Sequence, residues 1–115
     1  MPSASIILTS TTAGTLNAQY VEPTTNVDGS PVTNLKQTNI SVSFDAGGAF
    51  AMAAIDLASA PTGGGSRNKT VPGIAVPASS ASAIVRLVAE NTAGFKSDPV
   101  DITVAIARPI PNPVN

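Results

Sequence analysis

The chain contains no cysteine and no histidine. Without cysteine it can form neither a disulfide nor a thiolate site. Without histidine it lacks the commonest general base and the commonest transition-metal ligand. Paired carboxylates could still perform acid–base chemistry. We interpret Glu22, Asp28, Asp98 and Asp101 as solvated charges at strand ends, so we expect a protein that is not an enzyme and uses no cofactor.

Charged and aromatic residues are also scarce. Charged residues make up 11% of the 115 residues, against about 25% in an average soluble domain. The net charge of −1 gives no reason to expect nucleic acid or an anionic membrane as a partner. Aromatic residues are 3%, but hydrophobic residues reach 43%, so the chain should fold. A neutral surface rich in Ser, Thr, Ala, Asn and Gly resists self-association poorly. This favours a subunit packed in an assembly, with an ordinary soluble domain as the alternative.

Long hydrophobic runs are missing as well. No stretch approaches the roughly 20 apolar residues of a membrane span. The first ten residues have no basic region, and their apolar run extends only from Ile6 to Leu8. We therefore expect a mature start without a signal peptide. The length of the chain indicates a single domain.

What is present is a series of short, β-rich runs separated by turn residues. Alternation of apolar and polar residues predicts half-buried strands. The clearest strands are expected at residues 15–22, 38–45, 81–91 and 100–106. Shorter ones are expected at 5–10 and 69–76, and Pro72 places the latter at a sheet edge because proline cannot donate to a ladder. About seven strands in all predict an all-β fold, an antiparallel β-sandwich with extended terminal segments.

Two segments are less clear. Residues 49–60 fit helical and strand spacing equally well. We expect the return strand of a hairpin, because the segment follows a glycine turn after a strong strand; a short helix is the alternative. Residues 61–68, with three consecutive glycines, are expected to form a flexible loop with nothing to pack.

Three stretches resemble the fibronectin type III family. Tyr20-Val21-Glu22-Pro23 stands where the family commonly has Trp-x-x-Pro, and "PTTNVDGSPVTNL" (Pro23 to Leu35) resembles the loop that follows in bacterial and phage members. Residues 87–99 resemble the last two strands and their loop. The resemblance covers about residues 14 to 106 and implies the fold rather than an activity. Two family aromatics are replaced, by Tyr20 and Ala83. Tyr20 and Phe44 must then fill the core, with Phe50 as a further candidate.

The loop "NVDGSPVTNL", residues 26–35, has some features of a calcium loop. Such a loop needs several oxygen ligands and a late bidentate acid. Asn26 and Asp28 are suitably spaced, but Thr24 and Leu35 stand at the first and last ligand positions. We therefore expect a structural turn. The sequence Gly63 to Arg67 resembles an anion-binding loop but lacks the following Lys and helix. The glycosylation patterns at Asn39 and Asn68 we attribute to chance.

We expect the function to depend on contacts made by the protein surface and by the two terminal segments. We divide the chain into an N-terminal arm or first strand (1–10), a fibronectin-like sandwich (11–106) and a proline-rich tail (107–115), which favours an extended conformation. The candidate protein-interface residues are Phe95, Arg108, Pro109, Ile110, Pro111 and Pro113.

Stand-alone domains of this type resemble phage virion proteins. The resemblance implies a head decoration or cement protein at the particle surface, made in the host cytoplasm. Its partners would be the major capsid protein, other virion subunits or copies of itself. The alternatives are a tail or baseplate subunit and an adhesion or carbohydrate-binding module. A glycan site would need exposed aromatic rings, and only Phe95 is expected to be available.

Overall fold

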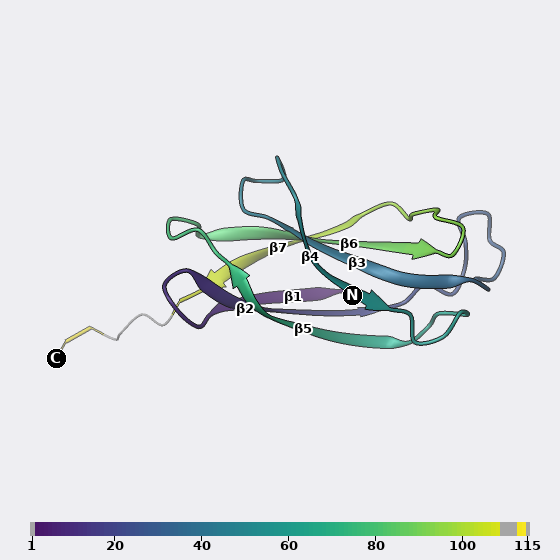
Figure 1. The fold of residues 1–115 in the computed structure, drawn as a ribbon, viewed down its shortest axis with the longest axis horizontal. Coiled ribbons are helices and arrows are strands. Elements are labelled where there is room, and N and C mark those ends of the chain that lie inside the picture. The colour runs from purple at the N-terminus through teal and green to yellow at the C-terminus, as the bar shows by residue number, and fades with distance from the viewer. Residues whose placement is uncertain (1, 109–112, 115) are drawn as a thin grey trace.

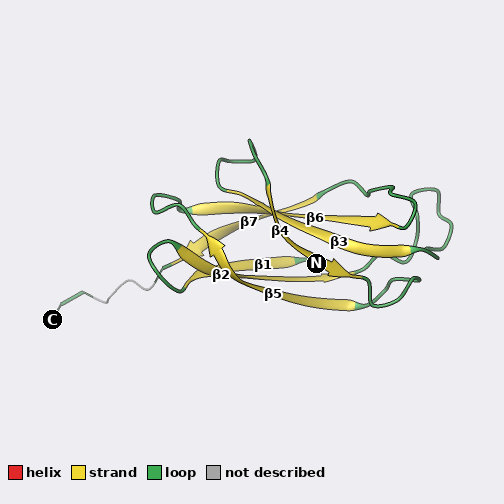
Figure 2. Cartoon of the chain, in the orientation of Figure 1, coloured by secondary structure: helices red, strands yellow, loops and turns green. Residues whose placement is uncertain are grey.

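A computed structural model describes residues 2–108 and 113–114, and within these it contains seven strands and no helix (Figures 1 and 2). The strands are β1 (Ser3–Leu8), β2 (Ala13–Val21), β3 (Leu35–Ser43), β4 (Ala51–Leu57), β5 (Ser66–Ala75), β6 (Ser82–Asn91) and β7 (Val100–Ala107). The all-β class and the seven strands are thus confirmed. Residues 49–60 contain strand β4 rather than a helix.

The strands form one mixed sheet in the order β4-β3-β6-β7-β1-β2-β5. Neighbouring strands are antiparallel, except that β1 pairs in parallel with β7 through Ile6–Ile106 and Ile7–Ala107. The expectation of a wholly antiparallel arrangement is therefore wrong at this one ladder. The sheet curls until β4 and β5, at the two ends of the order, approach one another, which makes it nearly barrel-shaped (Figure 1). Strand β5 is an end strand, as Pro72 indicated.

Apolar residues at alternate positions of the strands meet inside the curled sheet. Leu16, Ala18 and Tyr20 of β2 are all buried, as their spacing predicted. Ile6 of β1 and Ile40 of β3 are fully enclosed. The other buried members of this core are Leu8, Val42, Val76, Ala83, Val85, Leu87, Val104 and Ile106.

The aromatic residues divide between the core and the surface. Tyr20 is buried and Phe44 packs against the core, as expected. Phe50 is not part of this cluster: the guanidinium of Arg86, an outward-facing residue, lies 3.9 Å from the centroid of its ring. Phe50 precedes the first residue of β4, so it is not held in the alternation that points side chains inward.

Candidate functional site

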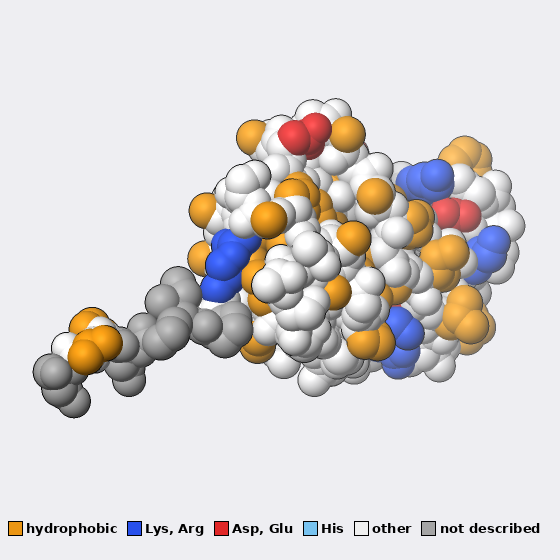
Figure 3. Space-filling view, turned by 60° about the vertical axis from the view of Figure 1, so that its left-hand side comes forward, with side chains coloured by type: hydrophobic (Ala, Val, Ile, Leu, Met, Phe, Trp, Pro, Cys, Tyr) orange, Lys and Arg blue, Asp and Glu red, His pale blue; other side chains and the backbone are white. Residues whose placement is uncertain are grey.

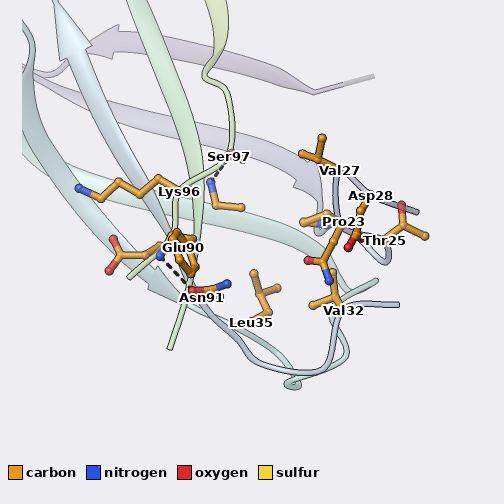
Figure 4. A pocket seen from close by; sticks show the side chains of 13 residues that line it. Pro23, Thr25, Val27, Asp28, Val32, Leu35, Glu90, Asn91, Lys96 and Ser97 are labelled. Atoms are coloured by element: carbon orange, nitrogen blue, oxygen red, sulfur yellow. Dashed lines mark hydrogen bonds between the residues drawn. The ribbon is translucent and has the colours of Figure 1, made fainter. Parts of the chain in front are cut away.

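Loops from two parts of the chain enclose an apolar groove at one end of the sheet. The loop between β2 and β3 lies on one side, and the loop between β6 and β7 lies on the other. The groove has a volume of about 480 Å³. Its lining (Figure 4) comprises Pro23, Thr25, Asn26, Val27, Asp28, Val32, Leu35, Ala89, Glu90, Asn91, Phe95, Lys96 and Ser97.

The β2–β3 loop is stiffened by its own polar side chains. The Asp28 carboxylate accepts hydrogen bonds from Ser30 N (3.0 Å) and Ser30 Oγ (2.6 Å). These bonds lower the pKa of Asp28 below its usual value. The Asn26 amide donates to Ser30 Oγ, and Thr25 bridges Pro31 across the loop. The residues that suggested a calcium loop thus bind one another and form a turn.

The β6–β7 loop is held in a comparable way around Asn91. The Asn91 Oδ1 atom accepts hydrogen bonds from the backbone N–H groups of Ala93 and Phe95, both at 3.0 Å. Gly94 has φ = 88°, a conformation that favours glycine. The backbone of Phe95 is therefore fixed, while its side chain is 74% exposed.

Buried side chains form the floor of the groove, and charged ones lie at its rim. Val32 and Leu35 are buried between the two loops, and Figure 4 shows Leu35 between Asn91 and Val32. Across the opening, Val27 is fully exposed. An apolar centre with a polar rim is the usual composition of a protein-binding patch. The titratable residues of its lining are Asp28, Glu90 and Lys96.

A third loop, residues 58–65, is tied to the same end of the sheet by Glu22. Glu22 is 3% exposed. Its carboxylate accepts hydrogen bonds from Ser59 N (2.9 Å), from Ser59 Oγ and from Gly65 N (3.0 Å). Burial acts to raise the pKa of Glu22, but the hydrogen bonds outweigh it and the pKa is lowered. The interpretation of Glu22 as a solvated charge is therefore wrong.

The expectation that the glycine run has nothing to pack is also wrong. A side chain at Gly63 would collide with the carbonyl oxygen of Pro23, and one at Gly65 would meet Ser59 and Glu22. The glycines are thus needed for close approach of the loop to the end of β2. No anion site forms there, because the Gly65 N–H is already bound to the Glu22 carboxylate.

A second polar cluster, inside the curled sheet, has no counterpart in the sequence-based expectations. The Tyr20 hydroxyl donates to Asp56 Oδ2 at 2.6 Å, and Arg67 Nη2 donates to Asp56 Oδ1 at 2.9 Å. Burial first, and then the hydrogen bond to Asp56, raise the pKa of Tyr20 to about 12. An aspartate between Ile55 and Leu57 was the available signal. These side chains satisfy one another, so the cluster joins β2, β4 and β5 rather than offering a site.

The expected interface residues do not form one site. Phe95 lines the groove, whereas Arg108 follows β7 at the other end of that strand and donates to the carbonyl oxygen of Ala78 at 3.2 Å. Eight residues of strand separate the two ends by about 27 Å. Pro113 is exposed. Pro109, Ile110 and Pro111 lie outside the described residues.

The surface composition agrees with the sequence. Few charged side chains interrupt the largely neutral surface in Figure 3. Within residues 2–108 and 113–114, no three acidic, His or Cys residues are grouped so as to hold a metal ion. The same described residues contain no helix long and apolar enough to cross a membrane.

The chain was compared with models of protein families, with curated proteins and with solved structures. None of the three comparisons gave a match.

Proposed function

We propose that the chain is a non-enzymatic structural protein of a virus particle, a head decoration or cement protein that binds capsid subunits. The observation that carries this proposal is the groove at the end of the sheet, with Phe95 and Val27 exposed beside it on two stiffened loops. Aromatic anchors near a desolvated apolar patch supply most of the binding energy in protein interfaces. Because both loops are already ordered, binding would cost little conformational entropy.

We further propose that the curled sheet is a fibronectin type III-like sandwich. Strands β1, β2 and β5 form one antiparallel group, and β4, β3, β6 and β7 form another. In the described part of the chain, strand pairing between these groups is limited to the two residue pairs of β1 and β7. Three and four strands in two layers would be the division expected of an immunoglobulin-like domain.

The low charge of the chain supports an assembled subunit over a free one. A neutral surface gains little from remaining solvated, and few charges must be desolvated when it is covered. The tail from residue 107 onward would add a second contact, since a proline-rich segment loses little entropy on binding. It leaves the sheet at the end remote from Phe95, so groove and tail would contact different neighbours.

The groove is tested with Phe95→Ser and particles that lack the protein. We expect the variant to bind at least about tenfold more weakly than the unchanged chain, because the anchor is lost. Val21→Ser is the matched control: Val21 is 65% exposed but does not line the groove. Its binding, measured by co-sedimentation with the particles, should be unchanged. Equal binding of Phe95→Ser would contradict the role of the groove.

The assignment to the head is tested by quantitative mass spectrometry of purified particles. A head decoration protein should be present in proportion to the major capsid protein. A few copies per particle would instead indicate a tail or baseplate subunit. Absence from the particles, together with retention on a glycan array, would favour the adhesion or carbohydrate-binding alternative.

A further inference from the structure

Strand β4 lies at one end of the strand order, and in the part of the chain that the structure describes it pairs only with β3. The backbone N–H of Ala58 donates to Lys36 O of β3 at 3.0 Å. Backbone groups of alternate residues point to opposite sides of an antiparallel strand. The N–H and C=O groups of Ile55 and Leu57 therefore face away from β3. Within the described residues, these groups have no backbone partner.

The same strand presents large apolar side chains on its outer face. Ile55 lies opposite Asn39, and a register shift of the β3–β4 ladder places Met52 opposite Ser41. Asn39 and Ser41 alternate with the enclosed Ile40, so their partners on β4 also point outward. Met52, Ile55 and Leu57 are 59%, 49% and 66% exposed. We call these three side chains, with the free backbone edge beside them, the β4 edge.

The other end strand, β5, carries devices that prevent edge pairing. A register shift of the β2–β5 ladder opposite Pro72 and Gly73 interrupts it, and Arg67 and Lys69 add charge. Proline, irregular backbone and charged residues are the usual protection of exposed edges. Strand β4 has no proline, lysine or arginine. Its one charge, Asp56, is buried and bound by Tyr20 and Arg67.

Charges at the two ends of β4 favour one direction of pairing. Lys36 lies beside Ala58, just after the strand, and Asp45 lies in the turn before it. If two copies of β4 ran antiparallel, Lys36 of one copy would approach Asp45 of the other at both ends. A parallel pair would instead bring like charges together.

We propose that the β4 edge is a self-association surface, at which β4 of one copy pairs antiparallel with β4 of a second copy around a two-fold axis. The pairing joins the β4-β3-β6-β7 groups of two copies into one continuous sheet. It satisfies the free backbone groups and covers Met52, Ile55 and Leu57 with their own counterparts. Such a contact is closed and self-complementary, so it yields a dimer rather than a filament. This inference does not depend on the proposed attachment to a particle.

Sedimentation velocity over a range of protein concentrations tests the association. We expect a monomer–dimer equilibrium for the unchanged chain. The double variant Ile55→Lys, Leu57→Lys should dimerise at least about tenfold more weakly, because four lysines would meet across the axis. Val21→Lys, which introduces a lysine at an exposed position of β2, should dimerise normally. A monomer at every concentration, or equal loss in the Val21 variant, would overturn the proposal.

Hydrogen exchange locates the contact independently of these variants. Protection of residues 49–58 should increase with protein concentration, whereas protection of β5 should not. Ile55→Pro removes an N–H that β3 does not use, so the monomer should keep its circular dichroism spectrum. The same variant should lose the concentration-dependent protection. Protection that rises only outside residues 49–58 would show a different interface and refute the proposal.

Discussion

Tyr20 combines apolar packing with a buried polar contact. Its ring lies among the apolar residues, and its hydroxyl donates to Asp56. Asp56 is held in turn by Arg67. A buried carboxylate is tolerated only when it is paired and hydrogen-bonded. These residues therefore fix how β2, β4 and β5 meet.

The ionisation of Tyr20 should be visible directly, because the chain has one Tyr and no Trp. We expect the tyrosinate absorbance of the folded protein to titrate at about pH 12, above the ordinary pKa of 10.0. The folded state then holds the proton more tightly than the unfolded state. Stability contributed by this group is complete below pH 10 and is lost as the pH rises towards 12. Asp56→Asn should lower the midpoint, since the hydrogen-bonded charge is removed.

Asp101→Asn is the control for this titration. Asp101 pairs with Arg86 at 2.8 Å on the surface, remote from Tyr20 in the ladder order. Its substitution should leave the midpoint where it is. A folded-state midpoint near pH 10 in the unchanged chain would contradict the buried hydrogen bond.

For single residues, the sequence predicted which side chains point into the core better than it predicted which side chains contact one another. The alternation of Leu16, Ala18 and Tyr20 was enough to place all three inward. It could not show that Asp56 faces Tyr20, because the two lie 36 residues apart and meet only through the curl of the sheet. Glu22 was misjudged for the same reason, since its donors lie on Ser59 and Gly65.

Among the elements, the loop of residues 58–65 differs most from expectation. Three consecutive glycines suggested flexibility, but Gly63 has φ = 66° and lies against Pro23. Gly65 donates to the Glu22 carboxylate. The glycines therefore permit a close and ordered approach, which the local sequence does not distinguish from a loose loop.

Gly63→Ala should destabilise the protein more than Gly29→Ala does. Both residues have positive φ, so each alanine costs about 1 to 2 kcal/mol in backbone strain. At Gly29 nothing lies within 4 Å of the added carbon, whereas at Gly63 the carbonyl of Pro23 must also move. Urea unfolding of the two variants measures the difference. Equal losses of stability in the two variants would mean that the loop shifts away from Pro23 at no energetic cost, and would contradict the prediction.

The strands themselves were largely predictable, and their limits less so. Strand β6, Ser82–Asn91, lies within the expected segment 81–91. Strand β5 begins at Ser66 rather than near Lys69, because pairing of Ser66 with Val21 extends it. Pairing of this kind depends on the partner strand, so the segment alone could not reveal it.

At the scale of the whole molecule, the two ends of the chain have unequal roles. Strand β1 lies between β2 and β7 in the strand order, and its Ile6 is fully enclosed. Residues 3–8 are thus the first strand of the sheet. Arg108, after the last strand, contacts only the carbonyl of Ala78 among the polar contacts described.

Deletion of residues 2–8 should therefore unfold the protein, whereas deletion of residues 109–115 should not. Loss of Ile6 and Leu8 from the core removes about 3 to 6 kcal/mol of hydrophobic stabilisation. That is comparable with the total stability of a small domain, about 5 to 15 kcal/mol. Circular dichroism and urea unfolding of both deletions provide the measurement. A folded protein without residues 2–8 would show that β1 is dispensable.

The arrangement of the molecule was the least predictable part. Local alternation cannot reveal that β1 runs parallel to β7, nor that the β2–β3 and β6–β7 loops enclose a groove. Both depend on contacts between residues far apart in the chain. Phe95 was correctly expected to be exposed. That Val32 and Leu35 lie near it could be seen only in the folded structure.

The short parallel ladder between β1 and β7 has a mechanical consequence. The chain enters β1 at Ser3 and leaves β7 at Ala107, at opposite ends of two strands that run the same way. A pull on the two ends of the chain would slide one strand along the other. The hydrogen bonds of the ladder would then be loaded together, in shear, instead of breaking one after another.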